Sequence, residues 1–144
     1  MRLEASSAAS SLRLMRVFLN TYKGELHMCS RTIKKNRLKS AQQQRFRCYY
    51  CGHPMWHQNN HENFARKYRV SLKQVRWFQC TAEHIQARCD GGNNQSSNIV
   101  AACRLCNERR HRRPDPLDPE AYRALVTKRI SRGKWLPNAL VDQF

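Results

Sequence analysis

Two Cys-x-x-Cys pairs are the residues whose types and spacing point most directly to chemistry. The first pair is Cys48 and Cys51, and the second is Cys103 and Cys106. Two intervening residues let both sulfurs of a pair reach one ion at about 2.3 Å, and two pairs complete a tetrahedral shell. Gly52, which follows the first pair, suits the tight backbone curl of a zinc knuckle. The sequence therefore predicts a structural Zn²⁺ site.

Disulfides, a redox dithiol and unrelated free thiols are the alternative interpretations of these cysteines. Residues 1–11 have no apolar central region before a cleavage site, so no signal peptide is predicted. We therefore expect a cytoplasmic protein, and a reducing compartment favours bound metal over disulfides. A second zinc site is conceivable from the remaining cysteines and nearby histidines, but its spacing matches no established pattern, and buried or incidental side chains are expected instead. Those residues are Cys29, Cys80, Cys89, His53, His57 and His61.

A second set of polar residues lies between the cysteine pairs and just after them. In chain order it comprises Glu83-His84, the Gly91-Gly92 turn, Asn98 before an Ile-Val-Ala run, Asn107 directly after the last cysteine, and His111. Taken alone, the Glu83-His84 dipeptide would be a surface ion pair at the end of a strand. The order and spacing of the whole set, over residues 48–113, resemble the HNH (His-Me finger) endonucleases.

This resemblance implies a ββα-metal fold, in which a hairpin and a helix hold a catalytic cation, and an activity that hydrolyses DNA phosphodiester bonds. His84 would be the general base, because a neutral imidazole can take the proton of a water molecule. Glu83 and Asn107 would offer oxygen ligands to Mg²⁺ or Mn²⁺. The ion would stabilise the phosphorane and the leaving oxygen, which implies 5′-phosphate and 3′-hydroxyl ends.

Asn98 and His111 have less direct expected roles in the same scheme. The amide of Asn98 is expected to brace the loop after His84 against the second strand, which would orient the imidazole. His111 lies four residues after Asn107, one helical turn along the same face, and is expected to be a third metal ligand or else a phosphate contact. Many relatives have aspartate where this chain has Glu83, which leaves the metal preference open.

Several arginines near this set are candidates for nucleic-acid contacts. A guanidinium fork matches the oxygens of a backbone phosphate, whereas the alternative is a solvated helix end. The candidates are Arg88, Arg109, Arg110, Arg112 and Arg113.

The elements that must position these residues can be predicted from the hydrophobic pattern. Residues 60–75 have helical periodicity, and residues 77–81 favour a strand running into Glu83-His84. Residues 98–101 favour a second strand, and a helix is expected to begin near Ala102. Residues 115–133 favour a further helix, which Asp118 caps and Gly133 ends. The predicted fold class is α+β: a small ββα-metal domain stapled by the four-cysteine zinc site, with flanking helices. Its expected divisions are a basic N-terminal arm (1–45), partly helical around residues 12–19 or disordered, an HNH core (46–114), and a C-terminal helix and tail (115–144).

The charge of the chain indicates its partner. Lysine and arginine number 27 against 10 acidic residues, for a formal net charge of +17. A field of that sign attracts polyanions, and we favour DNA over an anionic membrane surface, since no apolar run is long enough to span a bilayer. A merely solvated surface is the remaining alternative.

The favoured function is thus that of a metal-dependent DNA endonuclease of bacterial or phage origin. A homodimer is a possible state of the chain, because two active sites could cut both strands. Two alternatives remain: a catalytically silent zinc-finger protein that binds nucleic acid, and an RNA-directed nuclease of the same fold.

Overall fold

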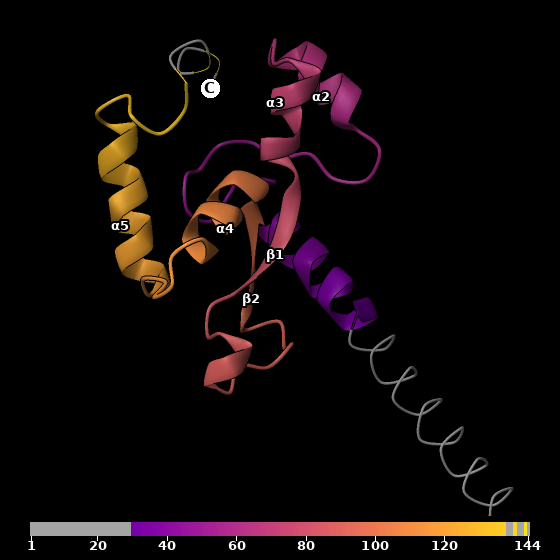
Figure 1. The fold of residues 1–144 in the computed structure, drawn as a ribbon. Coiled ribbons are helices and arrows are strands. Elements are labelled where there is room, and N and C mark those ends of the chain that lie inside the picture. The colour runs from indigo at the N-terminus through magenta and orange to yellow at the C-terminus, as the bar shows by residue number, and fades with distance from the viewer. Residues whose placement is uncertain (1–29, 138–139, 141–142, 144) are drawn as a thin grey trace, which may run out of the picture. The chain divides into compact units, whose positions relative to one another are not determined.

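A computed structural model describes residues 30–137, 140 and 143 of the chain (Figure 1). The chain divides into two units, residues 1–32 and 33–144, and every element from α2 to α5 lies in the second. The expected helix around residues 12–19 and Cys29 lie outside the described residues.

A β-hairpin followed by a helix forms the centre of the second unit. Strand β1 (Cys80–His84) pairs antiparallel with β2 (Ile99–Cys103), with Cys80 opposite Cys103 and His84 opposite Ile99. Helix α4 (Arg104–His111) follows β2 directly and packs on both strands. This ββα arrangement, with four clustered cysteines, confirms the predicted α+β class.

The segment before β1 differs from the prediction. Residues 60–75 form two short helices, α2 (His61–Lys67) and α3 (Leu72–Val75), because the chain leaves α2 through Arg69 at φ +49° and starts again at a capping box of Ser71 and Gln74. The predicted strand over residues 77–81 is wrong in its first part, since α3 continues into the 3₁₀ helix η1 (Arg76–Phe78).

The helix that follows α4 along the chain matches its sequence signals. Helix α5 (Pro119–Ile130) has proline at its first position, and the Asp118 side chain accepts hydrogen bonds from the backbone N–H groups of Glu120 and Ala121. Its buried residues, Tyr122 and Val126, belong to the same core as Phe78 and Cys103.

Residues 30–43 are helical, and the segment that follows covers the outer edge of β2. The Gln44 side chain donates to the Ala101 carbonyl at 2.8 Å and accepts from the Ala101 N–H at 2.9 Å, as a neighbouring strand would. Ser40, which is buried, donates to the Ile99 carbonyl at 2.6 Å. The backbone groups of a two-stranded sheet are thereby satisfied on its open side.

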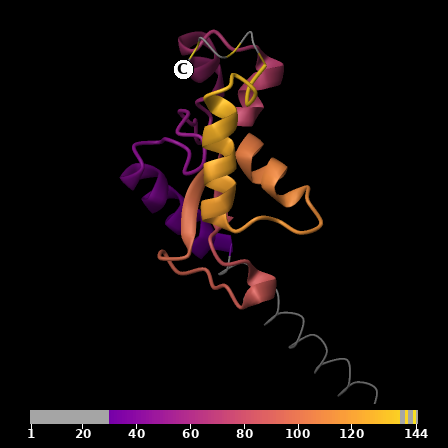
Figure 2. The same cartoon turned by 90° about the vertical axis from the view of Figure 1, so that its left-hand side faces the viewer.

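The loop between the strands, residues 85–98, lies at one end of the hairpin, while α2 and α3 lie at the other (Figures 1 and 2). The loop contains the short 3₁₀ helix η2 (Arg88–Asp90), which ends at Gly91 with φ +83°. Gly92 admits no side chain, because a Cβ there would overlap the carbonyl of Gln86. Within the described residues, no helix is long and apolar enough to cross a membrane.

Candidate active site and metal centre

The four predicted zinc ligands lie together. Cys48 and Cys51 flank a turn closed by the Arg47–Pro54 bridge, while Cys103 and Cys106 lie at the junction of β2 and α4. Their sulfur atoms all lie within 4.8 Å of one another, and the Cys51 and Cys103 sulfurs are 3.8 Å apart. A tetrahedron with metal–sulfur bonds of about 2.3 Å has edges of about 3.8 Å. The cluster therefore fits one Zn²⁺ ion.

The electrostatics of this cluster also favour a cation. Burial opposes ionisation of Cys48, but hydrogen bonds from the neighbouring thiols outweigh it and hold the pKa of Cys48 well below its ordinary value. The Cys103 N–H also donates to the Cys48 sulfur at 3.2 Å. The pKa of Cys106 is raised well above its ordinary value, by burial and by its neighbours. One cysteine of the cluster can therefore be a thiolate without metal, but ionisation of the other cysteines requires a cation between the sulfurs.

Glu83 is a buried carboxylate at the junction of β1 and α4. It is 1% exposed and forms an ion pair with Arg110, which is also buried and whose Nε donates to the Leu117 carbonyl at 3.0 Å. The Tyr50 hydroxyl donates to Glu83 Oε1 at 3.0 Å. Burial, and next the charge of Glu83, raise the pKa of Tyr50 well above its ordinary value, so the phenol stays a donor.

His111, on the last turn of α4, is brought to Glu83. Its Nε2 atom lies 3.2 Å from each carboxylate oxygen, and its side chain is 47% exposed while that of Glu83 is 1% exposed. Two ligands at right angles around Mg²⁺, each at about 2.1 Å, are about 3 Å apart. The 3.2 Å spacing of Glu83 and His111 is that of a direct hydrogen bond, and it is also close to the spacing of two neighbouring ligands of one divalent cation.

Asn107 is held against β1 next to Glu83. Its amide nitrogen donates to Thr81 Oγ1 and to the Ala82 carbonyl, both at 3.0 Å. These contacts fix the side chain beside the residue that precedes Glu83.

His84 is the last residue of β1 and is bonded into the loop rather than to the Glu83 group. Its Nε2 atom lies 2.9 Å from Asn94 Oδ1. The Asn94 backbone is tied in turn to the helix over residues 30–43, since the Asn36 amide donates to the Asn94 carbonyl at 2.6 Å. Successive strand residues point to opposite faces, so Glu83 and His84 leave β1 in different directions.

Asn98 ties this loop together through its amide. Its Oδ1 accepts from the Gln86 N–H at 2.8 Å, and its Nδ2 donates to the carbonyls of Gln86 at 3.1 Å and Asn93 at 2.8 Å. All three bonds lie within the loop that runs from His84 back to β2.

If the chain has the nuclease activity expected from its sequence, Asn98→Ala should lower the reaction rate about 10-fold, because contacts that orient a ligand or catalytic side chain typically contribute factors of about 10 to 100. Single-turnover rates of plasmid nicking would measure this. The matched control is Gln95→Ala in the same loop, since Gln95 is hydrogen-bonded there through its backbone N–H and carbonyl. Equal rates for the two variants would contradict a role for the Asn98 amide.

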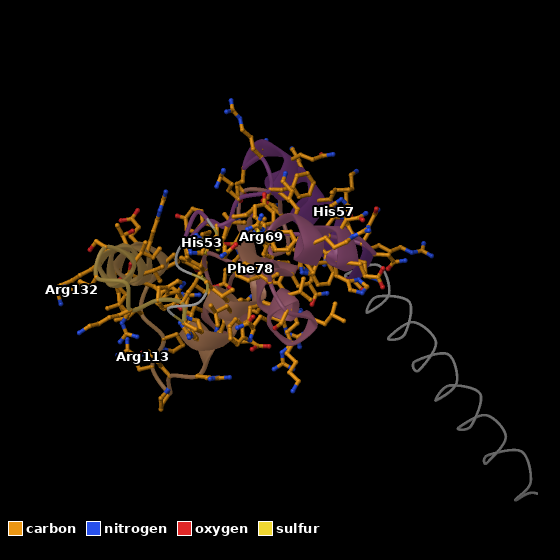
Figure 3. The ribbon with its side chains drawn as sticks, turned by 90° about the horizontal axis from the view of Figure 1, so that it is seen from above. His53, His57, Arg69, Phe78, Arg113 and Arg132 are labelled. Atoms are coloured by element: carbon orange, nitrogen blue, oxygen red, sulfur yellow. The ribbon has the colours of Figure 1, made fainter. Side chains whose placement is uncertain are left out.

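The candidate arginines fall into two groups. Arg110 faces inward to Glu83, and Arg109 donates to the Trp135 carbonyl at 2.7 Å and stacks on the Trp135 ring. Arg88, Arg112 and Arg113 are exposed. Figure 3 shows Arg113 at the periphery and Phe78 in the interior. Only the exposed group is available for phosphate contacts without rearrangement.

Three positioning residues were not predicted from the sequence: Tyr50, Asn94 and Asn36. Tyr50 lies between two predicted zinc ligands, which was the one available signal, but nothing in its position indicates a contact with Glu83.

Comparison with known proteins identifies the central segment. Residues 71–113 match the family model of the HNH endonucleases. The matched segment contains β1, β2 and α4, and with them Glu83, His84, Asn98 and His111. No curated protein and no solved structure matches the chain.

Proposed function

We propose that this chain, whose residues 71–113 match the family model of the HNH endonucleases, is a metal-dependent nuclease that hydrolyses DNA phosphodiester bonds. The observation that carries the proposal is the convergence of Glu83 and His111, from β1 and from α4, with His111 Nε2 at 3.2 Å from both carboxylate oxygens. A buried carboxylate beside an exposed imidazole suits a cation that must also contact a substrate.

Glu83 and His111 would hold Mg²⁺ or Mn²⁺, with Asn107 as a third candidate ligand. When bound, the ion supplies Lewis-acid stabilisation of the charge that develops on the phosphate and on the leaving oxygen. Arg110 balances the charge of the buried Glu83 carboxylate, and the Tyr50 hydroxyl helps to orient it.

His84 would accept the proton of the attacking water. If Asn94 Oδ1 accepts a hydrogen bond from His84 Nε2, Nδ1 is the ring nitrogen left to take the proton. Asn94 would then hold the imidazole in the tautomer that can act as the general base.

Nicking of supercoiled plasmid by the zinc-loaded full chain tests this proposal. We expect relaxed circles to accumulate with Mg²⁺ or Mn²⁺ and not in EDTA, and the new ends to carry 5′-phosphate and 3′-hydroxyl groups. A chain that binds the plasmid but nicks it with neither metal would contradict nuclease activity and support the silent zinc-finger alternative. Cleavage of RNA in preference to DNA would support the RNA-directed alternative.

The exposed arginines after α4 are expected to contribute phosphate contacts. A double Arg112→Gln, Arg113→Gln variant should bind a DNA duplex more weakly and with a shallower salt dependence, by about 0.9 in the log–log slope for each phosphate that is no longer neutralised. Fluorescence anisotropy across a salt series, with Ca²⁺ replacing the catalytic ion, measures both quantities. Arg104→Gln is the matched control, because Arg104 already pairs with Glu108 at 2.7 Å. An unchanged slope in the double variant would argue against these contacts.

A further inference from the structure

Tyr50 connects the zinc knuckle to the candidate active site. It lies between Cys48 and Cys51, is 2% exposed, and donates its hydroxyl to Glu83 Oε1, 33 residues further along the chain. Its ring packs edge-on against Tyr122, with the centroids 4.9 Å apart. The phenol is thus held at both ends, by the knuckle backbone and by a buried ring.

The two oxygens of Glu83 have different surroundings. Oε1 accepts from the Tyr50 hydroxyl and from Arg110, both of which are buried. His111 Nε2 lies 3.2 Å from both oxygens, and within the described residues it is the one hydrogen-bonding partner of Oε2. The terminal torsion of a glutamate is broad and roughly two-fold, so nothing in the side chain itself selects which oxygen faces outward. The donors on Oε1 make that selection.

We propose that Tyr50 is a positioning residue through which the zinc knuckle orients Glu83: because Tyr50 and Arg110 hold Oε1, Oε2 keeps its lone pairs for a divalent cation beside His111. The zinc site then has a second role besides stability, since it places a donor on the carboxylate that binds the catalytic ion. This inference rests on the proposed function, because it concerns the same cation.

Tyr50→Phe isolates this role better than a change at Arg110. Removing Arg110 would leave a buried carboxylate without its counter-charge, which destabilises a protein strongly. Phenylalanine keeps the ring and its packing on Tyr122 and removes only the hydroxyl. Tyr122→Phe is a closely matched control: it removes the buried hydroxyl of the contacting ring, which donates to the Cys106 carbonyl at 2.9 Å and not to Glu83.

The test is a Mn²⁺ titration of the zinc-loaded full chain in the absence of DNA. Electron paramagnetic resonance measures how much of the Mn²⁺ is bound. We expect Tyr50→Phe to weaken Mn²⁺ binding about 10-fold, the lower end of what outer contacts to a metal ligand contribute. Zinc content should stay at one ion per chain in all three proteins, and Tyr122→Phe should bind Mn²⁺ as the parent does.

Equal Mn²⁺ affinity in Tyr50→Phe and the parent would overturn the inference and leave the proposed nuclease intact. An equal weakening in Tyr122→Phe would also overturn it, because the effect would then come from packing of the knuckle. A parent that binds no Mn²⁺ would refute the cation site itself, and with it both proposals. Nicking rates measured in parallel separate these cases.

Discussion

The His84→Ala variant is expected to nick supercoiled plasmid at least about 100-fold more slowly than the parent, since a general base typically contributes about 10² to 10⁴ in rate. The imidazole is bonded to Asn94 and not to the Glu83 group, so its removal should leave the buried ion pair and the cysteine cluster in place. Metal binding and melting temperature should therefore stay close to those of the parent. Single-turnover nicking at saturating enzyme measures the chemical step.

His57→Ala is the matched control for this experiment. His57 is a half-buried histidine that stacks on Phe46, with ring centroids 5.0 Å apart, and it lies outside the segment that matches the HNH family (Figure 3). Its replacement should leave the nicking rate within about two-fold. If His84→Ala nicked as fast as His57→Ala, the assignment of His84 as the base would be wrong.

Cys106→Ser is expected to abolish stoichiometric zinc and to unfold the second unit. Cys106 is fully buried, and a structural zinc ion contributes about 10 kcal/mol or more in small domains. That is comparable with the whole stability of a typical domain, about 5–15 kcal/mol. Elemental analysis of zinc, together with circular dichroism during a thermal ramp, would show both losses. Chelation of the parent should reproduce them, and more readily as the pH falls, because protons compete with zinc for the thiolates.

Cys80→Ala separates this effect from the general cost of changing a buried cysteine. Cys80 is 3% exposed and sits opposite Cys103 in the hairpin, yet it does not belong to the four-sulfur cluster. Burial raises the pKa of Cys80 to about 11, and its sulfur is not among the four that lie within 4.8 Å of one another. The variant should retain one zinc per chain. Full zinc occupancy and an unchanged melting temperature in Cys106→Ser would refute the proposed structural site.

The cysteine cluster and the order of strands and helix were predictable because their signals are local. A Cys-x-x-Cys spacing reports directly how far apart two sulfurs can be, and the apolar run at Ile99 followed by a helical pattern predicts β2 and α4 within two residues of their observed starts. The error at residues 77–78 has a local cause as well. Aromatic residues favour strands, but the helix that Ser71 caps continues directly into a 3₁₀ helix that ends at Phe78.

Arg110 illustrates what a local pattern cannot supply. Arg109, Arg110, Arg112 and Arg113 form one basic cluster in the sequence, and each was an equal candidate for a phosphate contact. The structure turns Arg110 inward, where it balances the charge of Glu83, and leaves Arg112 and Arg113 exposed. A buried carboxylate requires a counter-charge, but which of four neighbouring arginines supplies it depends on how α4 rotates against β1.

The amino-acid sequence alone was sufficient to group the four cysteines that cluster in the structure and to predict the ββα order, since covalent spacing and hydrophobic period act over a few residues. The three-dimensional fold was needed to reveal which oxygen of Glu83 accepts a hydrogen bond from Tyr50, 33 residues away. It was also needed to reveal that Asn36 contacts Asn94, in the loop that follows His84, from 58 residues away. Such contacts exist only after distant segments pack around a common core, and no short-range pattern encodes that packing.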